Sequence, residues 1–236
     1  MYKTIHSLLF VSLSAVATAS AQAADTSRIF FEQTATTLSK GDVSVDLEYS
    51  FISAGVATGI RAGAFGGEIM LNSASDTHTG FANSSIGYKK SIGKGLAAYG
   101  IVSYFDDGTV ANSSTNIAVG AAYTMKSGDI TLNINPELVS DDSIAPAGPR
   151  AGKNTVFVKG LAAYKLKQVP VSLVAEVILD NNAALERVIN LGARWQPKKN
   201  LTVDMIVYSD LGSSGVAGAN VEYKSIPGYV IVNYLF

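Results

Sequence analysis

The chain has 236 residues, of which 47% are hydrophobic and 16% charged, with a formal net charge of −1 and no cysteine. The near-neutral balance excludes the basic surface that nucleic-acid binding requires, and the lack of cysteine excludes disulfides, thiolate metal sites and a lipoprotein anchor. Because a water-soluble chain of this length usually carries more charge, we expect much of its apolar surface to face something other than water.

Residues 1–23 have the pattern of a secretory signal peptide. A basic start at Lys3 is followed by an apolar run over 8–13, and Ala21-Gln22-Ala23 matches a cleavage pattern, so we expect an exported mature chain that starts at Ala24. We interpret residues 24–41 as a periplasmic lead-in. Within it, Arg28–Phe31 either pairs as a strand or tucks into the end of the following domain, and the sequence does not decide between these alternatives.

From Asp42 onward, apolar and polar residues alternate. In the first such stretch, apolar residues occupy the odd positions 43–51 and polar residues the even positions 44–50. Side chains on a strand point alternately to opposite faces, so each strand has one apolar and one polar face. No run after the leader reaches the 18 apolar residues of a spanning helix. The predicted strands are 42–52, 57–65, 67–72, 82–91, 95–105, 116–125, 128–138, 154–166, 169–179, 186–196, 200–209 and 228–236.

The connections between these strands differ in length. Short turns carry glycine or lysine, namely Gly66-Gly67 and the turns with Lys89, Lys90, Lys94, Lys126, Lys165, Lys167, Lys198 and Lys199. Four of them follow an aromatic residue, Tyr88, Tyr123, Tyr164 or Trp195, and aromatic rings at one level of several strands are typical of a membrane-interface girdle. The other connections, 73–81, 106–115, 139–153 and 180–185, are longer and rich in Gly, Asn, Ser and Asp.

The last strand is apolar or aromatic at alternate positions up to the final residue. Its signature residues are Gly228, Val230, Val232, Tyr234 and Phe236. This strand resembles the terminal strand of bacterial outer-membrane β-barrel proteins, which the barrel-assembly machinery reads during insertion. The resemblance implies an all-β fold, a transmembrane antiparallel up-and-down β-barrel over 42–236, located in the bacterial outer membrane with lipid as its surroundings. In length and pattern the chain is similar to the small twelve-strand porins for oligosaccharides.

The number of strands has two candidate values. A closed bacterial barrel has an even number of strands, and the twelve above leave 210–227 as the last loop. The stretch 216–224 also alternates, and if it spans together with 28–36 the number becomes fourteen. We predict twelve, because fourteen would place the short turns on the outer side.

The polar faces carry charges that must avoid lipid and therefore face the interior. These candidate pore-lining residues are Asp46, Glu48, Arg61, Glu68, Lys159, Glu176, Arg194 and Asp204. Either they line a wet pore, or they pair across a filled interior. The sequence does not decide whether residues 24–41 plug the lumen. Twelve strands enclose more space than side chains easily fill. Small residues also recur on the inner face, namely Gly59, Gly63, Gly87, Ala118, Gly120, Ala122 and Gly192. We therefore predict a pore.

The predicted function is a channel for passive diffusion of small polar solutes. The alternative is a non-conducting structural or surface-interaction barrel whose loops 106–115, 139–153 and 210–227 meet a partner. The porins that this chain resembles commonly have arginine-rich lumens for anionic sugars, whereas only Arg61, Arg194 and Lys159 are expected inside this lumen, which argues against an acidic sugar.

Neither catalysis nor a cofactor is predicted. Outside the leader, His78 is the only histidine, and it lies in a loop with only common small polar residues beside it. The acid pairs Asp106-Asp107 and Asp141-Asp142 have oxygen ligands suited to Ca²⁺, but paired loop acids are expected to be solvated. We therefore predict no metal site and no enzyme.

Overall fold

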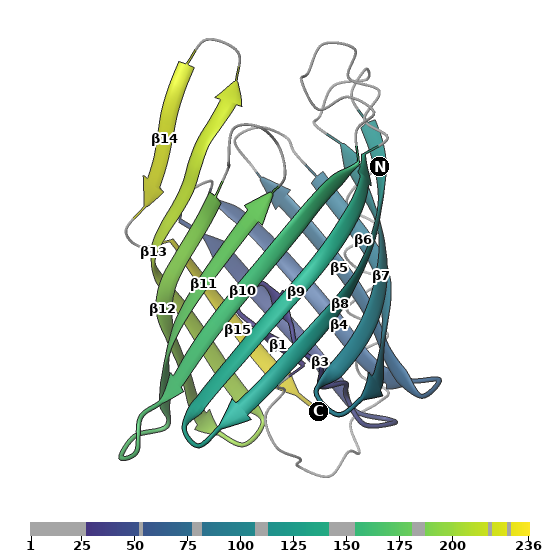
Figure 1. Ribbon diagram of the computed structural model, residues 1–236, viewed down its shortest axis with the longest axis vertical. Helices are drawn as coiled ribbons and strands as arrows, with labels where there is room; N and C mark the ends of the chain where they lie inside the picture. Colours follow the sequence, from purple (N-terminus) through teal and green to yellow (C-terminus); the bar gives the residue numbers. More distant parts are fainter. Residues whose placement is uncertain are drawn as a thin grey trace.

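The computed structural model describes residues 27–51, 54–76, 82–106, 113–141, 154–180, 187–216, 219–225 and 228–236. The signal peptide predicted over 1–23 lies outside them. Twelve strands form the barrel wall (Figure 1): β3 (Val43–Ser50), β4 (Gly55–Ala64), β5 (Gly67–Asp76), β6 (Ala82–Gly93), β7 (Leu96–Asp106), β8 (Ser113–Ser127), β9 (Ile130–Asp141), β10 (Thr155–Lys165), β11 (Val171–Asp180), β12 (Arg187–Lys198), β13 (Leu201–Val216) and β15 (Tyr229–Leu235). The described residues contain no helix long and apolar enough to cross a membrane.

The wall is closed through its last strand. β15 pairs with β3 on one side and with β13 on the other, with Val232 opposite Leu47 and Val203, and β13 pairs onward with β12. All pairings along the wall are antiparallel, and closure leaves no unpaired edge in the ring, as a membrane-spanning sheet requires. The predicted twelve-stranded antiparallel barrel is therefore confirmed.

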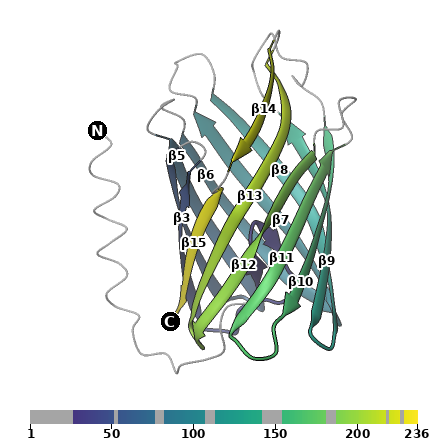
Figure 2. The same cartoon turned by 90° about the vertical axis from the view of Figure 1, so that its left-hand side faces the viewer.

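The stretch that left the strand number open does form a strand, but not one of the ring. β14 (Ala219–Ser225) pairs with the upper half of β13, and the two project past the rim of the barrel (Figures 1 and 2). The register shifts between Asp210 and Ser213, so β13 leaves the wall above this irregularity. The fourteen-strand alternative is thus wrong, and the segment predicted as the last loop, 210–227, contains the end of β13 and all of β14.

Several predicted boundaries also shift. β5 continues to Asp76 and β9 to Asp141, into stretches predicted as loops, because polar residues beyond the apolar band still pair with the neighbouring strand. The first short turn consists of Phe65 and Gly66, with φ of 53° and 73°, and not of Gly66-Gly67. Positive φ at both central residues is what a two-residue hairpin turn of type I′ needs.

A second, much smaller sheet lies inside the ring. β1 (Arg28–Ile29) and β2 (Glu32–Gln33) form a hairpin, which appears within the barrel in Figure 1. The segment Ser27–Gly41, which we call the plug, continues from this hairpin to the start of β3. Residues 28–36 therefore do not span the membrane, and the described part of the lead-in lies in the barrel and not below it.

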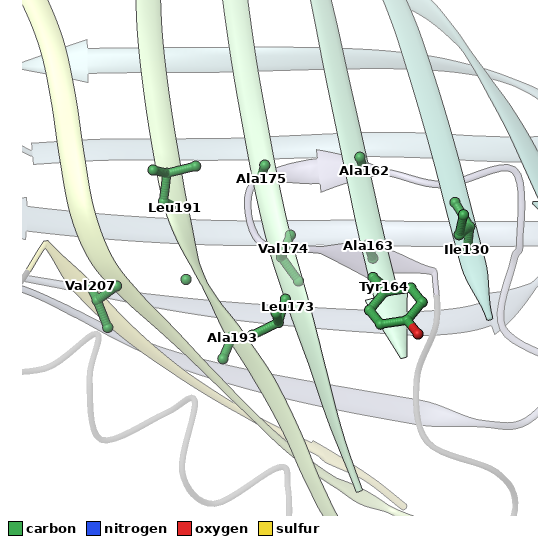
Figure 3. Close-up of a pocket in the computed structure, with 11 residues that line it drawn as sticks. Ile130, Ala162, Ala163, Tyr164, Leu173, Val174, Ala175, Leu191, Ala193 and Val207 are labelled. Atoms are coloured by element: carbon green, nitrogen blue, oxygen red, sulfur yellow. The ribbon is translucent and has the colours of Figure 1, made fainter. Parts of the chain in front are cut away.

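The outer face of the wall is apolar. On β3, Leu47 and Tyr49 are exposed whereas Ser44 and Asp46 are buried, so the predicted alternation holds. A groove of about 730 Å³ on this outer face, with Ala162 and Ala175 between the larger Tyr164 and Leu191, is open to the surroundings of the barrel (Figure 3). In the last strand, Tyr234 and Phe236 are exposed, Val230 and Val232 are half-buried on the same face, and Gly228 packs against Ser209.

Candidate functional site

The eight candidate pore-lining residues lie on the inward face of the wall. Five are buried, namely Asp46, Arg61, Glu68, Glu176 and Asp204, and three are half-buried, namely Glu48, Lys159 and Arg194. They face inward because each shares the inner parity of its strand with small or polar neighbours. The interior of the barrel is therefore the candidate site.

The two arginines of this set, Arg61 and Arg194, each form a forked ion pair with an acid on the adjacent strand. Arg194 donates from Nη2 and Nε to the two carboxylate oxygens of Asp204, at 2.6 and 2.7 Å, and the two residues stand opposite each other in the register. Arg61 donates from Nη2 and Nε to Asp46 at 3.0 and 3.2 Å. Bidentate geometry of this kind gives the strongest hydrogen-bonded charge pairs.

The predicted position of Lys89 in a short turn is wrong. It lies on β6 and is fully buried, and its Nζ donates to the carbonyl of Ser27 at 2.7 Å and to Gln33 Oε1 at 3.1 Å. Glu68 Oε1 is 3.5 Å from the same nitrogen. The alternation of the strand does place Lys89 on the inner face, because it lies two residues after the inward-facing Gly87. Two adjacent lysines, Lys89 and Lys90, are however also typical of a solvated turn.

Other inward residues of the wall were not singled out from the sequence. Glu137 forms an ion pair with Lys159 at 3.0 Å and accepts a hydrogen bond from the hydroxyl of Tyr99 at 2.9 Å. Asn133 and Asn135 donate from their side-chain amides to the carbonyl of Gln33 at 2.8 and 2.7 Å. These asparagines were placed on the inner face by alternation, but nothing in the sequence indicated what they would bind.

The backbone of the plug is held by wall side chains. The amide of Leu38 donates to Glu68 at 2.9 Å, that of Ala35 to Thr124 Oγ1 at 2.8 Å, and that of Phe31 to Glu176 at 3.2 Å. A chain segment without a ladder partner must satisfy its buried amides elsewhere, and here the inward-facing oxygens of the wall accept from them. The plug is thus docked in the barrel without being part of its sheet.

Apolar contacts complete the docking. The side chain of Phe30 is 0% exposed and packs, with Ile29, against inward-facing residues of three wall strands, namely Leu161, Ala163, Val174 and Ile206. Phe31 makes an edge-to-face contact with Tyr229, with ring centroids 5.0 Å apart. Burial of a whole phenyl ring contributes about 1.5–3 kcal/mol before any cavity cost.

The small inward residues do not leave open space. A Cβ at Gly63 would overlap the carbonyl oxygen of Ser39, so the plug runs against the wall there, and at Gly120 the ring of Tyr99 occupies the corresponding place. Small residues were expected to leave room for a pore, whereas here the plug and its neighbours use the room at these two positions.

Cavities within the described part of the barrel lie toward both of its ends. One of about 200 Å³ lies toward the longer loops and is lined by Arg28, Asp46, Glu48, Asn72 and Asn83. Another, of about 270 Å³, lies at the short-turn end, beside Ser172 and Arg194. Some free volume therefore remains above and below the plug.

Most of the loop residues that were weighed as catalytic or metal-binding candidates cannot be compared with the structure. His78, Asp107 and Asp142 lie outside the described residues. Within the described part of the chain, no group of three or more His, Asp or Glu side chains is placed to hold a metal ion.

The closed twelve-strand antiparallel ring with its charged interior defines a porin-like outer-membrane barrel fold. The chain is similar to the solved structure of the KdgM porin, with a TM-score of 0.55 and 9% identity over 83% of this chain and 99% of that one. It is also similar to the NanC porin, with a TM-score of 0.51 and 11% identity over 82% and 98% of the two chains. No family model and no curated protein matches the sequence. At such low identity the likeness concerns the fold alone.

Proposed function

We propose that the protein is an outer-membrane channel for small polar solutes, which the plug Ser27–Gly41 keeps closed in this structure. The observation that carries the proposal is that a separable segment docks in the lumen and, together with inward side chains such as Tyr99, fills its middle. The wall itself contributes small residues and charged groups there, with cavities on both sides. Withdrawal of this one segment would join the two cavities.

The charges of the interior support an open state. Replacing buried ion pairs by apolar residues of similar volume is often neutral or stabilising, so a permanently dry interior has no need of Arg61–Asp46 or Arg194–Asp204. In a water-filled channel the same charges would be solvated and would influence which solutes pass. The polar wall is therefore better suited to a lumen that is sometimes wet.

Planar-bilayer recordings test the channel. We expect the wild-type protein to give discrete current steps separated by long closed periods, because the plug must leave before ions pass. Protein that is shown by circular dichroism to be inserted as a barrel, yet gives no step across many insertions even when the plug is weakened, would contradict the proposal.

A second candidate is the non-conducting barrel that meets a partner at its surface. The filled lumen favours it, and so does the β13–β14 hairpin, which projects past the rim where a partner could reach it. The same recordings separate the two, since only the channel conducts.

The location in the outer membrane can be tested through the outer face. Leu191 is 43% exposed in the middle of β12. Leu191→Arg should destabilise the inserted barrel by about 2–4 kcal/mol, because a charge near the bilayer midplane faces lipid. Urea titration in phospholipid vesicles, followed by the fluorescence of Trp195, the single tryptophan, measures this. Ser127→Arg, at the exposed end of β8 beside a short turn, should change stability by less than about 0.5 kcal/mol. Equal effects of the two substitutions would contradict a lipid-facing wall.

A further inference from the structure

The buried and half-buried charges that the described wall turns toward the plug do not balance among themselves. They are six carboxylates, namely Asp46, Glu48, Glu68, Glu137, Glu176 and Asp204, and four cations, namely Arg61, Lys89, Lys159 and Arg194, whereas Lys126 and Lys165 share the inward parity of their strands but are exposed near the short-turn end. Each cation is within ion-pair distance of a different one of these acids, as Arg61–Asp46, Lys89–Glu68, Lys159–Glu137 and Arg194–Asp204. Two carboxylates, Glu48 and Glu176, are left without a cation from the described wall.

The plug supplies partners to both of these carboxylates. Glu176 accepts a hydrogen bond from the backbone amide of Phe31, in addition to one from Asn190. Glu48 faces the guanidinium of Arg28, whose Nη2 is 3.6 Å away, and Nη1 of the same group is 3.9 Å from Asp46. The cation that faces the carboxylate of Glu48 on β3 therefore belongs to the plug and not to the wall.

The ion pairing of Arg28 with the wall is loose, and its Nε is held within the plug by donating to the carbonyl of Phe30 at 2.6 Å. Its distances of 3.6 and 3.9 Å contrast with 2.6–3.2 Å in the forked pairs of Arg61 and Arg194, and its Nη2 makes no hydrogen bond although it is buried. The cavity of about 200 Å³ adjoins this guanidinium and is also lined by Asn72 and Asn83. Asn83 Oδ1 is buried there without a hydrogen-bond partner. The site thus offers to a cation the carboxylate of Glu48, the carboxylate of Asp46 that it would share with Arg61, amide groups and free volume.

We infer that Asp46 and Glu48 form a binding site for a small solute with a guanidinium or primary ammonium group, and that Arg28 is the tethered occupant that such a solute displaces. The inference rests on the proposed channel function and gives it a solute class. An arriving cation replaces a loosely held one of the same charge, so the site exchanges one occupant for another without ever exposing bare carboxylates. The excess of carboxylates around the plug also makes this part of the emptied lumen attractive to cations.

Uptake by proteoliposomes of full-length protein tests this with two matched solutes, labelled arginine and labelled citrulline, which has the same shape but no charge. In Arg28→Gln, arginine should enter about tenfold faster than citrulline, since a cleft lined by one sign of charge concentrates the opposite ion. In Arg28→Gln/Glu48→Gln the preference should fall to about twofold or less, with citrulline uptake unchanged. Lys40→Ala, an exposed cation of the same plug, serves as the control and should behave as wild type.

A measurement on the wild-type protein stands beside the variants in case Arg28→Gln does not fold. In a KCl gradient, the reversal potential of its current steps should report a potassium permeability about threefold or more above that of chloride. Conduction without cation preference, or equal entry of arginine and citrulline, would overturn the cation site and leave the channel intact. A barrel that passes neither ions nor either solute in any variant would overturn the channel itself, and the site with it.

Discussion

Replacing Phe30 by alanine should turn a channel that is mostly closed into one that is mostly open. The ring is fully buried among Leu161, Val174 and Ile206, so it is the main apolar anchor of the plug. Phe30 also has a φ of 51°, a region that costs a bulky residue about 1–2 kcal/mol, and the ring contacts must offset that cost. Without the ring, the hairpin keeps its hydrogen bonds but loses most of its apolar contact with the wall.

The size of the effect follows from the cost of truncating a buried phenylalanine, about 3–5 kcal/mol. Each 1.4 kcal/mol changes an equilibrium tenfold, so the ratio of open to closed channels should rise by about two to three and a half powers of ten. The open probability in planar bilayers measures this ratio directly. Because the ring belongs to the plug, the pairing of the twelve wall strands should be unchanged, and circular dichroism should show the same strand content.

Thr36→Ala is the matched control, since this residue lies on the same segment with an exposed side chain. It should leave the open probability at the wild-type level. If Phe30→Ala keeps the wild-type open probability while the barrel is intact, the plug is not what closes the lumen. Rising conductance in both variants would instead indicate that any change in the segment loosens it, and Phe30 would lose its role as the main anchor.

The strands and their faces could be predicted because the two-residue rhythm is a local property. On β8, Ile117 and Val119 point outward and Ala122 points inward, as alternation requires. Pairing with the neighbouring strand β7 does not change which face each residue takes. Strand ends were predicted less well, since polar residues such as Ser75 continue the pairing without continuing the rhythm. The chain therefore indicates which face each residue takes more reliably than where a strand stops.

What fills the lumen was not predictable in the same way. Residues 27–41 have no clear period, and their partners lie far away in the chain, for example Lys89 for Ser27 and Asp204 for Phe30. A strand pattern predicts that Asn133 and Asn135 face inward, but it does not predict that both donate to the backbone carbonyl of Gln33. The wall residues that contact the plug come from strands far apart in the chain, which lie together only in the closed ring.

Lys89→Met should be the most destabilising single change in the wall. Lys89 and Glu68 are both 0% exposed, so removing the ammonium leaves a buried carboxylate with no cation within ion-pair distance in the described wall. Breaking a buried pair in this way costs about 3–5 kcal/mol, most of it from the uncompensated charge. The same urea titration in vesicles, with Trp195 as reporter, measures the loss.

The double variant Lys89→Met/Glu68→Gln separates this charge effect from lost packing. Glutamine can still accept the hydrogen bond that Leu38 donates to Glu68, and no net charge remains buried, so stability should return to within about 1–2 kcal/mol of wild type. Lys90→Met, one residue further along β6 and exposed on the opposite face, should change stability by less than about 0.5 kcal/mol. If the double variant is as unstable as Lys89→Met alone, the lysine acts through its hydrogen bonds to Ser27 and Gln33 and not by neutralising Glu68. The plug would then be part of what stabilises the barrel, and Phe30→Ala should lower stability as well as open the channel.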